Sequence, residues 1–238
     1  MPSAIAAFER LRMPLPETCH GIAWFGIELA RCQALLGSLD LRVVTPDLAP
    51  CIDRRRLEYV AGRLCCELAL RSRALPAGPI GRNADGAPVW PARSCGSLSH
   101  GGDYVIAAAA SRADIELLGL DVERIVDDDD TRAIADVCLV NQELAALRDS
   151  IAPGLLATLL FSAKEAYYKA IHPRVGRYVD FLEVAVQVDF SAARFLVVPE
   201  TSRVLSTPAL PRLAGRFRKL DDHVLTWIAE PACGSGFI

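Results

Sequence analysis

The chain has 238 residues, of which 52% are hydrophobic, and its formal net charge is −3. This length allows one large domain or two smaller halves, and the near-balanced charge lacks the basic excess of nucleic-acid-binding proteins. The longest uncharged run, residues 150–163, is too short to span a bilayer, and residues 1–20 lack the pattern of a signal peptide. The eight cysteines show no C-x-x-C spacing, which favours buried thiols in a reducing compartment over a zinc site. We expect a cytoplasmic monomer with no membrane and no nucleic-acid partner.

Hydrophobic spacing predicts a mixed α+β chain. The first elements expected are a strand at residues 21–29, a helix at 53–70, a loop at 76–91 and a strand at 104–110. A second group follows, with a strand at 117–123, helices at 131–140, 141–149 and 153–173, and strands at 181–190, 194–198 and 224–229. Asn141 is expected to cap one of these helices and Pro173 to end another. Because each group combines one main helix with several strands, we predict two halves, residues 1–117 and 118–238.

Two features of the first half indicate phosphate binding. Arg63 follows Gly62, whose missing side chain would let a ligand approach. Residues 97–102 contain two serines, His100 and two glycines, and the hydroxyls, the imidazole and exposed backbone amides together suit a phosphate. A solvated helix face and a structural histidine are the alternative interpretations.

Two carboxylates share one face of the strand predicted at residues 117–123. Alternation places Gly119, Asp121 and Glu123 together on that face. Neighbouring carboxylates repel each other unless a cation lies between them. A solvated strand face would carry the same residues, so this pattern is weak by itself.

The helix predicted at residues 153–173 has apolar residues on every face, so we expect it to be buried. It nevertheless carries Lys164, Glu165 and Lys169, and two of the chain's three lysines lie here. Lysine can give up a proton and arginine cannot, which indicates proton chemistry or a compact phosphate contact. The alternative is a simple Glu165–Lys169 ion pair at i, i+4 spacing. With Asp121 and Glu123, Glu165 completes an oxygen-rich set that suits Mg²⁺.

In this order and spacing, these residues resemble the signature of Sfp-type 4′-phosphopantetheinyl transferases. The stretches that carry the resemblance are Ser97-x-Ser99-His100, Gly119-x-Asp121-x-Glu123 and Phe161-Ser162-x-Lys164-Glu165-Ala166-x-x-Lys169. Further stretches resemble the enterobactin-synthase-associated subgroup, namely Ala61-Gly62-Arg63, residues 86–91, and Lys169-Ala170 shortly before Pro173. Together the motifs cover residues 60 to 181.

The resemblance implies an enzyme that moves the 4′-phosphopantetheine group of coenzyme A onto a serine of an acyl or peptidyl carrier protein, releasing 3′,5′-ADP. It implies two similar α/β halves related by a pseudo-two-fold, with the active site between them. It also implies that Mg²⁺ is held by Asp121, Glu123 and Glu165, and that Glu165 and Lys169 are catalytic. Residues in contact with coenzyme A would be Arg63, Arg82, Ser99, His100, Lys164 and Lys169.

The residues leave several questions open. Other members of the family place several lysines at the adenine-phosphate end of coenzyme A, whereas this chain offers Arg63, Arg82 and the arginines at 54–56. Another Mg²⁺-dependent hydrolase or transferase acting on a nucleotide diphosphate would show the same three carboxylates. A coenzyme A binding protein without catalysis would keep the binding residues. Resemblance to the subgroup favours a carrier protein of secondary metabolism, such as siderophore assembly.

Overall fold

The structure is a computed structural model that describes residues 21–37, 52–78, 80–83, 86–200 and 209–232. The chain divides into two compact units. The described residues up to Glu116, together with Pro231 and Ala232, form the first, and Leu117–Glu230 form the second. Both combine helices with a sheet, which confirms the predicted mixed class. No helix in the described ranges is long and apolar enough to cross a membrane.

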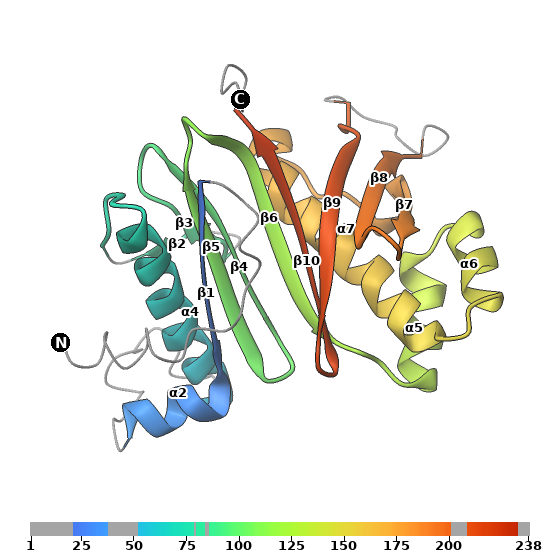
Figure 1. Cartoon of the computed structure of the whole chain (residues 1–238), viewed down its shortest axis with the longest axis horizontal. Coiled ribbons are helices and arrows are strands. Elements are labelled where there is room, and N and C mark those ends of the chain that lie inside the picture. Colours follow the sequence, from blue (N-terminus) through green and yellow to red (C-terminus); the bar gives the residue numbers. More distant parts are fainter. Residues whose placement is uncertain (1–20, 38–51, 79, 84–85, 201–208, 233–238) are drawn as a thin grey trace. The chain divides into compact units, whose positions relative to one another are not determined.

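The first unit is a three-stranded antiparallel sheet with one long helix packed on it (Figure 1). Its sheet order is β1-β5-β4. The elements are β1 (Ile22–Glu28), α2 (Leu29–Leu36), α4 (Asp53–Ser72), the short pair β2 (Gly81–Arg82) and β3 (Pro88–Val89), β4 (Ser94–Gly101) and β5 (Tyr104–Ser111). The central strand β5 carries four consecutive buried alanines, of which Ala107 and Ala109 belong to the core with α4, and their small side chains let this helix come close to the sheet.

The second unit is a five-stranded sheet with a long buried helix against it (Figure 1). Its sheet order is β6-β10-β9-β8-β7. The strands are β6 (Ile115–Arg124), β7 (Val184–Asp189), β8 (Arg194–Pro199), β9 (Leu213–Leu220) and β10 (His223–Pro231). The helices are α5 (Asp128–Cys138), α6 (Asn141–Arg148), α7 (Pro153–Val175) and the 3₁₀ turn η2 (Phe181–Glu183). Helix α7 covers the sheet with residues on most of its surface buried, as its apolar sequence predicts.

Several expected boundaries and elements differ from the structure. Pro173 does not end α7. It lies in the last turn, and the helix ends at Val175. Gly176 caps it, with a φ of 65° that suits glycine and an N–H that donates to the carbonyl of His172. Asn141 is not the N-cap of α6, because Val140 holds that position. The N–H of Val140 donates to the carboxylate of Glu143. Strand β9 and helix α2 were not expected, and residues 97–101, for which no element was predicted, belong to strand β4.

Candidate active site

Strand β6 and helix α7 approach each other unusually closely in the second unit. A Cβ atom built on Gly119 would lie 2.0 Å from the carbonyl oxygen of Ala166 and 2.6 Å from the amide nitrogen of Ala170. Only glycine fits at such a backbone contact. Asp121, two residues further along β6, therefore lies on the strand face that is pressed against α7.

Asp121 and Lys169 meet at this contact. The Nζ atom of Lys169 donates to Oδ1 of Asp121 at 2.6 Å, although 48 residues separate them in the chain. Asp121 is only 1% exposed, so the strand face that carries it is not a solvated edge. Burial raises the pKa of both Glu165 and Glu123, and the charge of Lys169 opposes that rise in each, so all four side chains share one electrostatic environment.

The carboxylates of this cluster hold more negative charge than one lysine can balance. Burial, and then the charge of Asp121, raise the pKa of Glu123 from 4.5 to about 8, while Lys169 opposes this and Glu165 adds to it. Burial is also the main cause that raises the pKa of Glu165. The cluster therefore retains a proton near neutral pH unless a further cation joins it.

The side chains of this cluster fit a metal ion in their chemistry. Within the described residues, no three acidic, histidine or cysteine side chains converge closely enough to hold a metal ion in the present arrangement. The donor set itself nevertheless consists of three carboxylates, which are the ligands that Mg²⁺ prefers. Because these carboxylates are short of positive charge, a divalent cation would stabilise them.

Lys164 has a different environment from the one expected for a coenzyme A contact. It is 2% exposed, and its Nζ atom donates to the carbonyl of Cys138 at 2.7 Å, to Oε2 of Glu143 at 2.7 Å and to the carbonyl of Phe181 at 3.0 Å. An ammonium group has three N–H donors, and these three contacts use all of them. The expectation that Lys164 binds a phosphate is therefore corrected, and we leave Lys164 out of the proposed substrate contacts.

In the first unit, His100 lies beside the arginines at the start of α4. The Nη1 atom of Arg55 lies 2.6 Å from Nε2 of His100. Since a guanidinium can only donate, Nε2 is the acceptor in this contact. Arg54 donates to the carbonyl of Gly102, and both arginines contact Glu58. The side chain of His100 is 40% exposed, so this cationic group is open to solvent.

A second cationic group surrounds Tyr59 on the same helix. The guanidinium carbon of Arg63 lies 4.7 Å from the centre of the Tyr59 ring, and that of Arg82 lies 5.8 Å from it. Arg55, Tyr59 and Arg63 follow one another at i, i+4 spacing and so share one face of α4. That spacing was visible in the sequence, but Tyr59 was not singled out there.

One detail of the phosphate hypothesis is wrong. Gly62 does not open a path for a ligand, because a Cβ atom there would meet the side chain of Leu98 at 3.0 Å, so this glycine serves helix-to-strand packing. Ser99 is 4% exposed and pairs with Ile106 between β4 and β5. The segment around His100 therefore belongs to β4, at the edge of its sheet, and the expected contact of Ser99 with coenzyme A stays a prediction.

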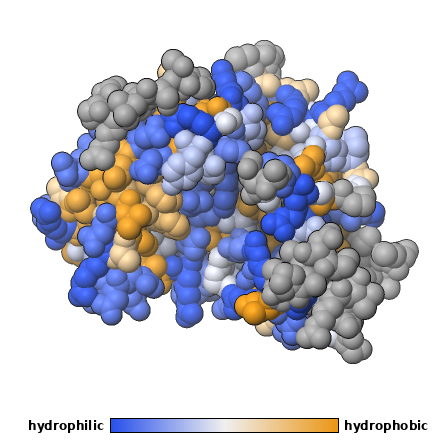
Figure 2. Space-filling model, turned by 180° about the vertical axis from the view of Figure 1, so that it is seen from behind, coloured by the Kyte–Doolittle hydropathy of each residue, from blue (hydrophilic) through white to orange (hydrophobic). Residues whose placement is uncertain are grey.

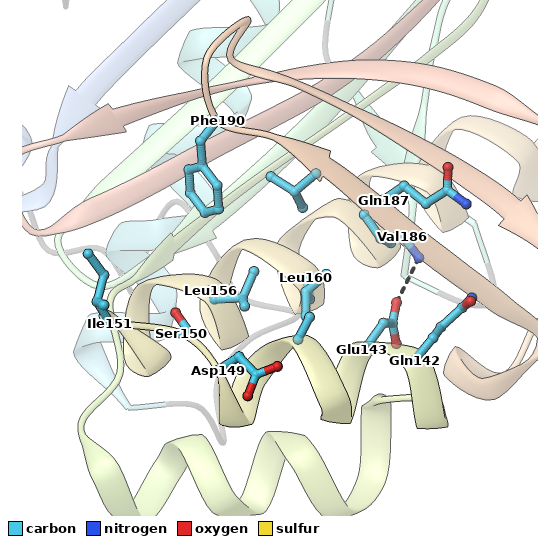
Figure 3. A pocket seen from close by; sticks show the side chains of 12 residues that line it. Gln142, Glu143, Asp149, Ser150, Ile151, Leu156, Leu160, Val186, Gln187 and Phe190 are labelled. Carbon is cyan, nitrogen blue, oxygen red and sulfur yellow. Dashed lines mark hydrogen bonds between the residues drawn. The ribbon is translucent and has the colours of Figure 1, made fainter.

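The chain also has a hollow that none of the expected site residues lines. Figure 2 shows hydrophobic side chains gathered on one surface of the molecule, at the left of the view. In the second unit, Ile151 and Phe190 expose apolar side chains beside a hollow of about 580 Å³, whose floor includes Leu156 and Leu160 (Figure 3). The residues that line this hollow are different from those of the acidic cluster.

Comparisons with known proteins identify the family of the chain. Residues 45–110 match the family "4'-phosphopantetheinyl transferase N-terminal domain", and residues 117–223 match the "4'-phosphopantetheinyl transferase superfamily". The chain is 34% identical to 4'-phosphopantetheinyl transferase Svp of Streptomyces mobaraensis, over 78% of this chain and 76% of that protein. It is 31% identical to 4'-phosphopantetheinyl transferase Npt of Nocardia iowensis, over 76% of this chain and 85% of that protein.

A shorter match extends to proteins of siderophore assembly. Enterobactin synthase component D of Escherichia coli is 35% identical over 49% of this chain and 55% of its own length. The two longer matches and the family model show the class to which the protein belongs. The chain belongs to the 4′-phosphopantetheinyl transferase superfamily and is an enzyme of that class, which transfers the phosphopantetheine group of coenzyme A to carrier proteins.

Proposed function

We propose that the transfer is carried out by Asp121, Glu123, Glu165 and Lys169 of the second unit. The observation that supports this most directly is the 2.6 Å contact between Lys169 and Asp121, in a cluster whose carboxylates are short of positive charge. Asp121, Glu123 and Glu165 would hold Mg²⁺. When bound, this ion would neutralise the pyrophosphate of coenzyme A and orient it.

Glu165 is the proposed general base. Burial raises the pKa of its carboxyl group, and a carboxylate acts best as a base when its pKa lies nearer the working pH. It would take the proton of the carrier serine as the hydroxyl oxygen attacks the phosphate. Lys169 would balance the charge that develops on the leaving 3′,5′-ADP or give it a proton, because an ammonium group can do both.

We assign the phosphates at the adenosine end of coenzyme A to the basic face of α4. Arg55 with His100, and Arg63 with Arg82, form two cationic groups there, of which His100 and Arg82 are exposed. A guanidinium group can donate two parallel hydrogen bonds to the oxygens of one phosphate. Arg56 takes no part, because it is 4% exposed and bonds Asp53. The arginines therefore take the place that lysines have in other members of the family.

The acceptor is proposed to be a carrier protein of secondary metabolism. This rests on the similarity to enterobactin synthase component D. Incubating the protein with coenzyme A, Mg²⁺ and one carrier at a time tests it, with fatty-acid, polyketide and nonribosomal peptide carriers compared by intact-mass spectrometry. Faster gain of one phosphopantetheine by the latter two carriers is expected, and a preference for the fatty-acid carrier would contradict the assignment.

The metal assignment is tested with Asp121→Asn and a matched control. Asp129→Asn makes the same change on an exposed residue of α5. We expect Asp121→Asn and EDTA-treated wild type to lose transfer, and Asp129→Asn to keep it. Full activity of Asp121→Asn, or of the wild type in EDTA, would overturn the proposal.

A further inference from the structure

Lys164 and Glu143 form a buried ion pair in the second unit. Their charged atoms lie 2.7 Å apart, and each side chain is 1% exposed. A buried pair of this kind is stable only when all of its donors and acceptors are used. Here the remaining partners are all backbone groups, so the pair acts on the positions of whole elements.

Both oxygens of the Glu143 carboxylate accept hydrogen bonds as well. Its Oε1 atom accepts from the N–H of Val186 at 2.7 Å, and its Oε2 atom accepts from the N–H of Val140 at 2.8 Å as well as from Lys164. Figure 3 shows the contact with Val186, which joins α6 to strand β7. Because β7 is the last strand of its sheet, this bond occupies a backbone donor on the outer side of the sheet edge.

Together the two side chains join five elements. Lys164 on α7 bonds the last residue of α5 and the first residue of η2, and Glu143 adds the start of α6 and strand β7. A positive charge is also favourable at the carbonyl end of α5. The residue that follows Lys164 on α7 is Glu165, so the pair fixes the helix at the position of the proposed base.

We propose that Lys164 is a positioning residue, which with Glu143 anchors α7 to α5, α6, η2 and β7 and thereby holds Glu165 in its reactive place. This rests on the proposed role of Glu165. In this proposal Lys164 contacts groups inside the second unit and does not contact a phosphate of coenzyme A. To reach a phosphate, Lys164 would have to leave three hydrogen bonds and abandon a buried Glu143 charge whose other hydrogen-bond partners are uncharged backbone N–H groups.

The test compares Lys164→Met with the double variant Lys164→Met/Glu143→Gln. Lys164→Met leaves the buried Glu143 charge without a cation, and we expect the melting temperature to fall by about 6–20 °C. In the double variant the buried charge is gone. The amide oxygen at position 143 still accepts from one of the two backbone N–H groups, of Val140 or Val186, while the other loses its acceptor, so we expect the melting temperature to recover in part. Lys219→Met is the matched control, since it removes the third lysine of the chain from an exposed site on β9.

Steady-state transfer is measured at a temperature at which circular dichroism shows each variant folded. We expect Lys164→Met to lower kcat on the order of 10²-fold, because a misplaced reacting group costs about that much. KM for coenzyme A should stay within about twofold, and the double variant should recover at least about tenfold in kcat. Lys219→Met should match the wild type.

Three results would overturn the inference. A lower melting temperature with unchanged kcat would make the pair structural only. A raised KM for coenzyme A that the second substitution does not restore would mean that Lys164 contacts coenzyme A. A double variant as slow as Lys164→Met would mean that Glu143 takes no part in positioning α7. If Glu165→Gln were as active as the wild type, the proposed function would fail instead, so the two failures can be told apart.

Discussion

The contact between β6 and α7 makes Gly119 the most sensitive backbone position of the proposed site. In Gly119→Ala, the new methyl group would start 2.0 Å from the Ala166 carbonyl oxygen, whereas real Cβ contacts do not fall below 3.0 Å. The strand and helix must therefore separate by at least about 1 Å, the difference between these two values. Overpacking of this kind costs about 1–3 kcal/mol.

The expected effects on stability and on activity can be measured separately. For a chain of this size, that cost lowers the melting temperature by about 2–12 °C. The same separation stretches the contact between Asp121 and Lys169, and we expect kcat to fall on the order of 10²-fold. Calorimetry gives the first quantity, and the mass-spectrometric transfer assay gives the second.

Gly78→Ala is the matched control for this substitution. A Cβ atom at Gly78 meets nothing within 4 Å, so this variant should keep both the melting temperature and kcat of the wild type. If Gly119→Ala were as stable and as active as Gly78→Ala, the close approach of β6 and α7 would not position the acidic cluster. That result would refute the reasoning.

Three further predictions concern the charges of the two units. Because the pKa of Glu123 is about 8 when folded and 4.5 ordinarily, the metal-free folded protein holds a proton that the unfolded chain has released. Its melting temperature in EDTA should therefore fall as pH rises from about 4.5 to about 8. Stabilisation by added Mg²⁺ should grow over the same range, and a flat profile would contradict this. Lys169→Arg keeps the positive charge, but arginine cannot give up a proton. If Lys169 is the general acid, kcat should fall on the order of 10²-fold and the basic limb of the pH profile should be lost. An unchanged profile would mean that Lys169 acts only through its charge. For His100→Ala, KM should rise with coenzyme A and change little with dephospho-coenzyme A, whereas equal losses with both substrates would remove His100 from the 3′-phosphate.

Elements that depend on short-range patterns were predicted well, and elements without such a pattern were missed. The periodicity of hydrophobic residues predicted the long helices α4 and α7 and most strands, because these patterns depend on neighbours within a few residues. The pairing of residues 97–101 as β4 was missed, since the buried positions there are Ser97, Ser99 and Gly101 and not apolar residues. Strand β9 was missed because it follows a proline-rich segment and carries charged residues on its exposed face.

The sequence by itself determined the family, the candidate carboxylates and the helix that carries Glu165. Motif order and spacing are properties of the sequence, so they can be recognised without knowledge of the fold. Only the tertiary structure decided which way each lysine of α7 points. Lys164 and Lys169 stand five residues apart on one helix, yet the first is bonded to Glu143, 21 residues away, and the second to Asp121, 48 residues away. Such pairings depend on which elements pack together, and the order of residues in one helix does not contain that information.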